Sequence, residues 1–567
     1  MTKRFLFSIL SLLTLSVSFV SALERDKEYF KAPDDWELSI GDQKDYFEAR
    51  LEKFCSAGNI ATQSLEYVCG TELSLQKIFK DKYWFKGNIA SNVSLAMAKN
   101  ERESFQVAVL PLKDKPLCGI TASMGPLVNA TGQKFPEGAI KIFNVEYVET
   151  TNACYPVAHK GWWPDPLVPM KAVDIPPAET RVVWVEIRSP ADVPAGHYQG
   201  ILTISGTNVE PFRINLDVEV WDFTLPKEQV VQTFTWLSAA NCGKRYGKER
   251  EVEMYRAYAE YFLDHKINPL DIGKAYVKSN DYSVVTENLE KGFQHGLARF
   301  EIPRLKGEAL KKYCDYLREK GWFDKAMIYG FKDEPHPRDY AAFRNDSETI
   351  RATVPDLKIF MAESPHPDLF GAVDIWWSSM PDDDPAAIRN QLSAGKEVWW
   401  YRCGIPIRLE YYRPFYEYPS DVLLDRPSID IRIFYLMIWK FQMTPATFFY
   451  SGMQWPKGFE KWPTEPWISP GPWNGDGYVV YPGDNGPLPS IRLECMTDGI
   501  EDYEYLYLLK TAVEKAKNAA AEDVEAAKKL LAVAPELIVF TWHYNKDPNA
   551  LLSFRRQVAE MIIKLSK

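Results

Sequence analysis

The sequence predicts a multidomain fold of α/β and β type: an N-terminal β-sandwich followed by a (β/α)8 barrel with C-terminal helices. Three observations lead to this prediction. The chain has 567 residues, too many for one ordinary domain. Apolar residues alternate with period two over residues 100–223, whereas strand and helix patterns take turns from about 230 to 452. Hydrophobic residues make up 46% and charged residues 25%, which is typical of a soluble globular protein with a large core.

The first 22 residues have the pattern of a secretory signal peptide. Lys3 and Arg4 precede an apolar stretch over residues 5–20, and the small residues Ser21 and Ala22 follow it. The stretch is too short and too rich in Ser and Thr for a comfortable transmembrane span. We therefore expect an exported protein, periplasmic or secreted after cleavage near Ala22, without a stable membrane anchor.

Charge and cysteine spacing argue against several classes of partner. The formal net charge is −10 and no long basic run exists, so we expect no nucleic acid partner. The eight cysteines are scattered, without a CxxC pair or a Cys/His cluster, so we expect no metal. No glycine-rich phosphate loop follows a strand, and no cofactor is expected. Aromatic residues make up 14%, which suits either sugar binding or a large aromatic core.

Residues 23–226 are expected to form the β-sandwich. Apolar and polar side chains alternate most clearly in RESFQVAVL (102–110), RVVWVEIRS (181–189) and FRINLDVEVWDF (212–223). Strands with this pattern pack one face on a core and expose the other to water. Gly, Pro and Asn/Asp turns separate these segments.

Residues 227–497 are expected to form the barrel. Several of its strands are apolar on both faces, as buried parallel strands are, and helical apolar stripes lie between many of them. A doubly wound sheet is the alternative, and the missing phosphate loop favours the barrel. The eight candidate strands are 230–237, 267–273, 297–305, 326–331, 358–364, 374–379, 396–403 and 446–452.

Residues 498–567 are expected to form helices packed on the barrel. Asp498, Glu501 and Asp502 would then crowd the first turn of a helix, where the helix dipole favours negative charge.

The segment AMIYGFKDEPHP (326–337) is the most informative for chemistry. Its apolar strand ends immediately before Asp333 and Glu334, and catalytic groups of barrel enzymes come from the carboxyl ends of strands. Neighbouring side chains on a straight strand point to opposite faces, so both carboxylates reach one pocket only if the chain turns there. Two adjacent carboxyl groups suit one general acid and one anionic stabiliser. A solvated loop with a helix-capping Asp is the structural alternative.

Other candidates lie at the ends of later strands. Glu363 could be the second carboxylate of a two-carboxylate glycosidase, or a loop residue. Trp377, Trp400 and Tyr401 are candidates for the sugar platform. They belong to the adjacent aromatic residues Trp376-Trp377 and Trp399-Trp400-Tyr401 at the ends of two strands. In each group one member would face the barrel core or the helices, and another would stack on a sugar.

Three segments resemble glycoside hydrolase family 123. SIRLECMTDGIEDYEYLYLL (490–509) resembles the signature R-x-E-x-x-x-D-G-x-E-D-Y-E-Y-L of that family's catalytic domain. YGFKDEPH (329–336) is similar to its paired Asp-Glu motif, and PADVPAGHYQGILTI (190–204) to its N-terminal sandwich. The resemblance spans most of residues 80–510.

The resemblance implies a β-N-acetylgalactosaminidase that releases β-linked N-acetylgalactosamine from glycolipid or glycoprotein glycans. It implies that Glu334 is the general acid/base, that Asp333 binds the acetamido group of the sugar, and that this group, not the protein, is the nucleophile. Arg492 and Glu494 match the signature and would approach the sugar, or instead pair structurally with the barrel rim. A two-carboxylate glycosidase that uses Glu334 and Glu363, and a glycan-binding protein without activity, remain as alternatives.

Overall fold

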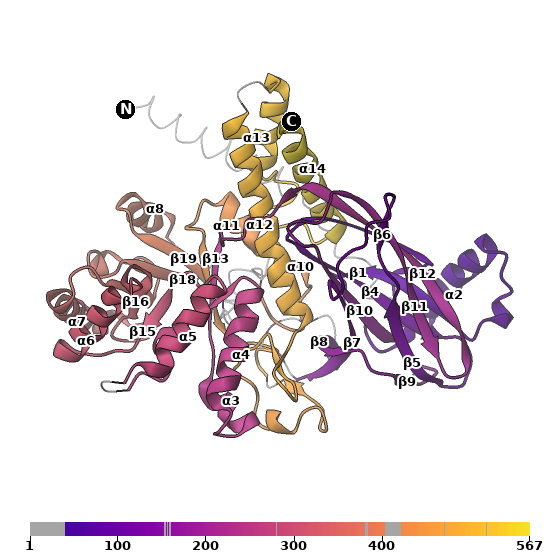
Figure 1. Ribbon diagram of the computed structural model, residues 1–567, viewed down its shortest axis with the longest axis horizontal. Coiled ribbons are helices and arrows are strands. Elements are labelled where there is room, and N and C mark those ends of the chain that lie inside the picture. The colour runs from indigo at the N-terminus through magenta and orange to yellow at the C-terminus, as the bar shows by residue number, and fades with distance from the viewer. Residues whose placement is uncertain are drawn as a thin grey trace, which may run out of the picture.

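The computed structural model describes residues 40–566, apart from 152, 154, 156, 158–159, 279–280, 380–383, 403–420, 470 and 517–518. The predicted signal peptide, residues 1–22, lies outside the described residues. Figure 1 shows a barrel and a β-sandwich on opposite sides of the long helix α12 (Ile491–Lys515), with further helices at the C-terminus. This arrangement confirms the predicted fold class.

Two sheets form the sandwich. One has the order β2-β1-β4-β10-β7-β21, with β8 also paired to β7, and the other has the order β3-β12-β11-β5-β9, with β6 paired to β11. The first sheet contains β1 (Tyr67–Leu73), β2 (Asn88–Ile89), β4 (Arg102–Pro111), β7 (Ile140–Thr150), β8 (Trp162–Pro169), β10 (Arg181–Arg188) and β21 (Ile468–Ser469). The second contains β3 (Asn92–Lys99), β5 (Leu117–Met124), β6 (Val128–Asn129), β9 (Val173–Ile175), β11 (Gly196–Gly206) and β12 (Val209–Thr224). Helix α2 (Ile40–Ala57) precedes them.

The first sheet is buried on both faces, which differs from the expected one-sided burial. Strand β4 is buried along its whole length. Val107 faces the sandwich core, whereas Ala108 and Trp184 belong to the core that continues into the barrel. The outer face is covered because α12 packs against β4 and β8. One-sided burial therefore describes the second sheet, where buried residues of β12 alternate with more exposed ones, but not the first sheet.

All eight predicted barrel strands form. They are parallel and hydrogen-bonded in the order β14-β13-β20-β19-β18-β17-β16-β15. Among the described residues β14 and β15 share no ladder, and the short helix η4 (Leu270–Gly273) packs against β15 at this gap. Each strand otherwise neighbours the strands before and after it in the chain, so the doubly wound alternative is wrong. The strands are β13 (Gln232–Trp236), β14 (Ile267–Pro269), β15 (Phe300–Ile302), β16 (Ala326–Tyr329), β17 (Lys358–Ala362), β18 (Ile375–Ser379), β19 (Glu397–Arg402) and β20 (Ala446–Ser451).

The barrel strands alternate between an inner and an outer core. On β16, Met327 and Tyr329 face the lumen, whereas Ile328 packs in the outer core with the surrounding helices. These helices are α3 (Ala239–Tyr246), α4 (Glu251–Asp264), α5 (Ser283–Gln294), α6 (Gly307–Glu319), α7 (Tyr340–Thr353), α8 (Pro385–Ser393), α10 (Ile429–Arg432) and α11 (Phe434–Lys440).

Helix α12 crosses the predicted domain boundary at residues 497 and 498. It runs unbroken from Ile491 to Lys515, so the barrel and the C-terminal helices are joined through one continuous element. Asp498, Glu501 and Asp502 consequently lie in its second and third turns, and the prediction that they occupy the first turn is wrong. Helices α13 (Ala521–Leu531) and α14 (Pro548–Leu565) follow.

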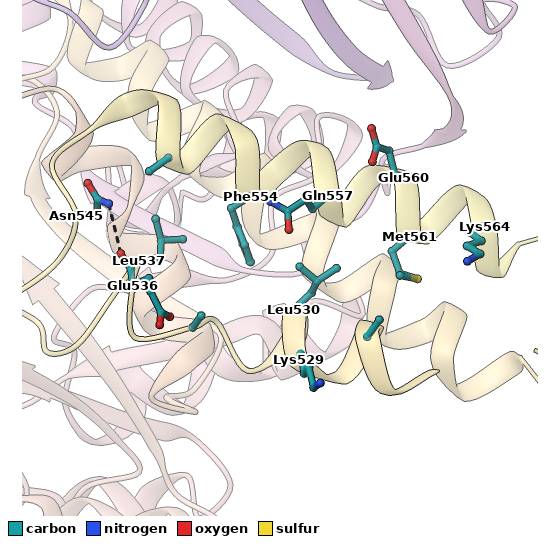
Figure 2. A pocket seen from close by; sticks show the side chains of 13 residues that line it. Lys529, Leu530, Glu536, Leu537, Asn545, Phe554, Gln557, Glu560, Met561 and Lys564 are labelled. Atoms are coloured by element: carbon teal, nitrogen blue, oxygen red, sulfur yellow. Dashed lines mark hydrogen bonds between the residues drawn. The ribbon is translucent and has the colours of Figure 1, made fainter. Parts of the chain in front are cut away.

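Helices α13 and α14 border a mostly apolar groove of about 660 Å³ (Figure 2). Leu530, Leu537 and Phe554 line it, and Lys529 and Lys564 are among the charged residues of its lining. Lys440, which donates to the carbonyls of Val533 and Ile538 beside the groove, precedes β20 in the chain. The groove therefore lies towards the amino ends of the barrel strands. Within the described chain, no helix combines the length and the apolar character that crossing a membrane requires.

Candidate active site

Asp333 and Glu334 follow β16 at the edge of the barrel where the carboxyl ends of the strands meet. Glu334 has a φ of 43°, in the left-handed region that side chains other than glycine rarely adopt. Such a conformation costs of order 1–3 kcal/mol and is typical of functional sites. It supplies the turn that two successive carboxylates need if they are to face one pocket.

Two tyrosines of the barrel hold these carboxylates. The Tyr329 hydroxyl on β16 donates to Asp333 Oδ1, and the Tyr401 hydroxyl on β19 donates to Glu334 Oε1 at 2.8 Å. Both tyrosine rings belong to the lumen cluster. Because the two strands come from different parts of the ring, both carboxylates lie above the same lumen. Asp333, Glu334 and Tyr401 are thus brought together from the predicted set.

Aromatic rings close the lumen below these carboxylates. Trp377 on β18 is fully buried, and its ring centroid lies 4.0 Å from that of Phe448 and 5.6 Å from that of Tyr329. Its indole N–H has no hydrogen-bond partner among the described residues. Trp377 therefore belongs to the buried aromatic cluster of the lumen, below the two carboxylates.

Glu363 also faces this site. It lies one residue beyond β17 and its Oε1 accepts from the Ser364 backbone N–H at 3.1 Å. Burial, together with the nearby Glu334 carboxylate, raises the pKa of Glu363 to about 7. The lumen edge therefore carries a third carboxyl group that is partly protonated at neutral pH.

Three further residues of the lumen were missed by sequence reasoning. Glu301 on β15 is buried, and its Oε2 accepts from Trp236 Nε1 at 3.0 Å and from Lys274 Nζ at 2.5 Å. Burial raises the pKa of Glu301, and the Lys274 ammonium opposes this rise. The Trp236 ring also contacts Tyr329, with centroids 5.8 Å apart. A single charged residue inside the apolar strand FEI, on its lumen-facing side, was the available signal.

Trp400 does not lie in the lumen. Its side chain is on the opposite face of β19 from Tyr401 and is only 5% exposed. The ring packs against Phe434 of α11 and Phe441, with centroids 6.4 and 5.9 Å away. The expectation that Trp400 contacts the sugar is therefore corrected: strand alternation sends Trp400 to the helices and Tyr401 to the pocket.

Arg492 is buried between the sandwich and loops that follow the barrel strands β19 and β20. Its guanidinium group donates to both Asp165 carboxylate oxygens of β8, at 3.0–3.2 Å, and to the carbonyls of Val422 and Gly475. All of these donors are used inside the protein, and the side chain has no exposed surface. Arg492 therefore joins α12 to the sandwich and to the loops that follow β19 and β20, a structural pairing that includes more than the barrel rim expected from the sequence.

Glu494, two residues further along the same helix, is likewise buried. Its Oε1 lies 3.2 Å from His265 Nε2, which in turn lies 2.9 Å from Arg102 Nη1 of β4. Burial alone would raise the pKa of Glu494, yet His265 and Arg102 hold it below its ordinary value. The structure thus separates Arg492 and Glu494 from Asp333 and Glu334.

The acidic residues of the α12 signature form a buried charge network. Arg432 of α10 donates to Asp498 at 2.9 Å, to Asp502 at 2.7 Å and to Glu103 of β4 at 3.1 Å. Lys266 lies 3.7 Å from Glu501. Buried carboxylates of this kind need such partners, because an unpaired charge in the interior is costly. The signature therefore holds sandwich, barrel and α12 together and does not touch the pocket.

Family models match both large domains of the chain. The model for the glycoside hydrolase 123 catalytic domain matches residues 244–509, and the model for the glycoside hydrolase 123 N-terminal domain matches residues 79–206. Together they cover more than two thirds of the chain. A search of the curated proteins found no match.

One solved structure shows the same fold over most of its length. A family 123 glycoside hydrolase from Clostridium perfringens, studied for glycolipid glycan hydrolysis, matches with a TM-score of 0.65 at 15% identity, over 88% of this chain and 97% of that one. A family 39 glycoside hydrolase from Bacteroides cellulosilyticus matches more weakly, with a TM-score of 0.30 at 11% identity, over 72% of this chain and 81% of that one. A family 5 xyloglucanase from Bacteroides ovatus also matches weakly, with a TM-score of 0.28 at 8% identity, over 72% of this chain and 98% of that one.

The two matched models agree in order and position with the sandwich and the barrel described above. The chain therefore belongs to glycoside hydrolase family 123.

Proposed function

We propose that this glycoside hydrolase is an exported, exo-acting enzyme that releases β-linked N-acetylgalactosamine from glycolipid or glycoprotein glycans by substrate-assisted retention. The observation that carries the proposal is the pair of consecutive carboxylates, Asp333 and Glu334, each accepting a hydrogen bond from a lumen tyrosine above an aromatic floor. The relative from Clostridium perfringens, linked to glycolipid glycan hydrolysis, supports the choice of substrate class.

In the first step Glu334 donates a proton to the glycosidic oxygen as the bond from that oxygen to the anomeric carbon breaks. The acetamido oxygen of the same sugar attacks the anomeric carbon, which produces an oxazolinium ring and releases the rest of the glycan. Tyr329 occupies Asp333 Oδ1, so Asp333 Oδ2 would accept the acetamido N–H and stabilise the positive charge that develops on the ring. An attack within one bound molecule needs no loss of translational freedom at that step.

In the second step Glu334, now ionised, removes a proton from a water molecule that attacks the anomeric carbon and opens the ring. Two inversions at this carbon give overall retention. Proton transfer by a positioned carboxyl group is typically worth about 10²–10⁴-fold in rate. No protein nucleophile is required by this scheme.

The lumen below would hold the terminal sugar. Trp377 would lie beneath this sugar as part of the buried aromatic layer, with its indole N–H enclosed by the protein. The Glu301–Lys274 pair offers a charged acceptor and a charged donor on the same wall, which suits sugar hydroxyls. Discrimination between galacto and gluco sugars would depend on which hydroxyl meets this pair.

The test is nitrophenol release from the aryl β-glycosides of N-acetylgalactosamine, N-acetylglucosamine and galactose. We expect turnover of the first, and a loss of about 10²-fold or more in kcat for Glu334→Gln and for Asp333→Asn. Glu319→Gln, an exposed carboxyl on α6, is the matched control and should keep full activity. Turnover of the plain galactoside by the wild-type enzyme would contradict acetamido assistance, and full activity of both site variants would contradict the site.

A two-carboxylate mechanism is the second candidate, and the raised pKa of Glu363 beside Glu334 favours it. A carboxyl group with a pKa of about 7 can act as a general acid at neutral pH, with Glu334 as the partner. This mechanism predicts hydrolysis of sugars without an acetamido group and a large loss of kcat in Glu363→Gln. If the wild-type protein hydrolyses none of the substrates but still binds glycans, the result would favour a glycan-binding protein.

A further inference from the structure

A phenylalanine stands exposed on the barrel rim beside the two carboxylates. Phe331 is 41% exposed. Among the described residues of the barrel, 232–451, it is the one large apolar side chain with more than a third of its surface open to solvent. It follows β16 and precedes Asp333 by two residues. Isolated exposed apolar residues are common on proteins, so exposure alone carries no meaning. The contacts of this ring and its position in the chain give a reason to assign it a function.

Arg304, from the end of the neighbouring strand β15, holds Phe331 in place. Its Nη1 donates to the Phe331 carbonyl oxygen, and its guanidinium carbon lies 5.7 Å from the centre of the Phe331 ring. Its Nη2 donates to Asp346 of α7 at 2.9 Å, which anchors the arginine in turn. A guanidinium group packed beside an aromatic ring stabilises the position of that ring. The exposed ring is therefore contacted by Arg304, which Asp346 of α7 anchors in turn.

The position of the ring matches the path of the leaving group. The lumen is closed below by the stacked rings of Trp377 and Phe448, so a terminal sugar enters from the rim. The bond that Glu334 would protonate then lies at the rim, and the remainder of the glycan extends outward over it. Phe331 and Glu334 are three positions apart in the chain, which limits their Cα separation to roughly 11 Å. The first sugar units beyond the cleaved bond extend over a comparable distance.

We propose that Phe331, positioned by Arg304, is the platform on which the first sugar of the leaving group stacks, and that it sets the preference of the enzyme for glycan over simple leaving groups. Flat aromatic faces suit the apolar face of a sugar ring, and contacts far from the reacting bond supply binding energy for catalysis. The inference rests on the proposed function for the location of the cleaved bond.

The experiment compares two leaving groups on one sugar. kcat/KM is measured for the methyl β-glycoside of N-acetylgalactosamine and for the disaccharide in which the same sugar is β-linked to galactose. We expect Phe331→Ala to lower the ratio of disaccharide to methyl glycoside about tenfold, which corresponds to about 1.4 kcal/mol. Phe331→Tyr, which keeps a flat ring, should retain the wild-type ratio. Phe540→Ala removes an equally exposed ring, 43% open, from the C-terminal region and should leave both values unchanged.

Arg304 is tested as a positioning residue through Phe331. Arg304→Gln should lower the same ratio, and the double variant with Phe331→Ala should lose no more than Phe331→Ala alone, since both changes remove one platform. A purely structural arginine would instead add its effect, or would lower both kcat/KM values equally.

A ratio within twofold of wild type for Phe331→Ala would overturn the proposal. The outcome is separable from failure of the proposed function, because that failure appears in the wild-type enzyme as no activity on N-acetylgalactosamine glycosides. In that case the same pair of leaving groups is compared on the sugar that the wild-type enzyme does hydrolyse. The ratio does not depend on which sugar occupies the lumen.

Discussion

Replacing Arg492 by methionine separates a structural from a substrate-binding role for this residue. The side chain is 0% exposed, and so is its partner Asp165, which would lose its ion pair and keep only the electrostatic attraction of the buried Lys77 ammonium. Of its hydrogen bonds from side chains, Asp165 would keep only the one that the Tyr481 hydroxyl donates, at 2.6 Å. Removing one partner of a buried ion pair typically costs about 3–5 kcal/mol.

The expected shift in melting temperature follows from the size of the chain. An unfolding entropy of about 2.1 cal/mol/K per residue gives roughly 1 kcal/mol/K for this protein, so the loss corresponds to about 3–5 °C if the domains unfold together. Tryptophan fluorescence during thermal unfolding measures this shift, and KM on an aryl glycoside well below the midpoint measures substrate binding. We expect a lower melting temperature with KM unchanged within about threefold.

The matched control is Arg556→Met on α14. Arg556 also pairs with a carboxylate, Glu219 at 3.0 Å, but its side chain is 48% exposed, so its loss should shift the melting temperature by no more than about 1 °C. If Arg492→Met melts like wild type and raises KM tenfold or more, Arg492 contacts the substrate and the structural argument is refuted.

Two further predictions concern the pocket edge and the signature helix. Because burial and Glu334 raise the pKa of Glu363 from about 4.5 to about 7, the folded protein keeps a proton there that the unfolded chain releases; this stabilisation is complete below about pH 4.5 and is lost as the pH rises through 7. We therefore expect Glu363→Gln to be about 1–2 kcal/mol more stable than wild type at pH 8.5 and equal to it at pH 4 in urea unfolding; equal stability at both would contradict the burial argument. In Gly499→Ala the new Cβ would lie 2.7 Å from the Arg432 carbonyl oxygen and 2.4 Å from the Tyr435 ring, so we expect a loss of about 1–3 kcal/mol, and a variant as stable as wild type would show that α10 and α12 can separate freely.

Local patterns predicted the barrel and the position of its two carboxylates. Most strands were recognisable because a short apolar run ended at Gly, Pro or a charged residue, and these preferences depend only on nearby residues. Asp333 and Glu334 were found for the same reason, as polar residues at the end of such a run. Two successive carboxylates can face the same side only if the chain turns between them, but the positive φ of Glu334 that makes this turn was not visible in the sequence.

Side-chain direction was harder to predict, because it depends on strand register. Trp400 and Tyr401 are adjacent and both aromatic, and a shift of one residue exchanges the one that faces the lumen for the one that faces α11. Glu301 was overlooked for a related reason: its value lies in its contacts with Trp236 and Lys274, which come from two other segments of the chain.

The sequence by itself determined the order of the domains, the eight strands and the carboxylate pair, since periodicity and chain turns are set by neighbouring residues. The tertiary structure alone decided what the α12 signature does. Arg492 meets Asp165 across 327 positions of sequence, and Arg432 meets Glu103 across 329. Partners so far apart are selected by packing and by the cost of burying a charge without its counter-charge, and neither of these is written in local sequence.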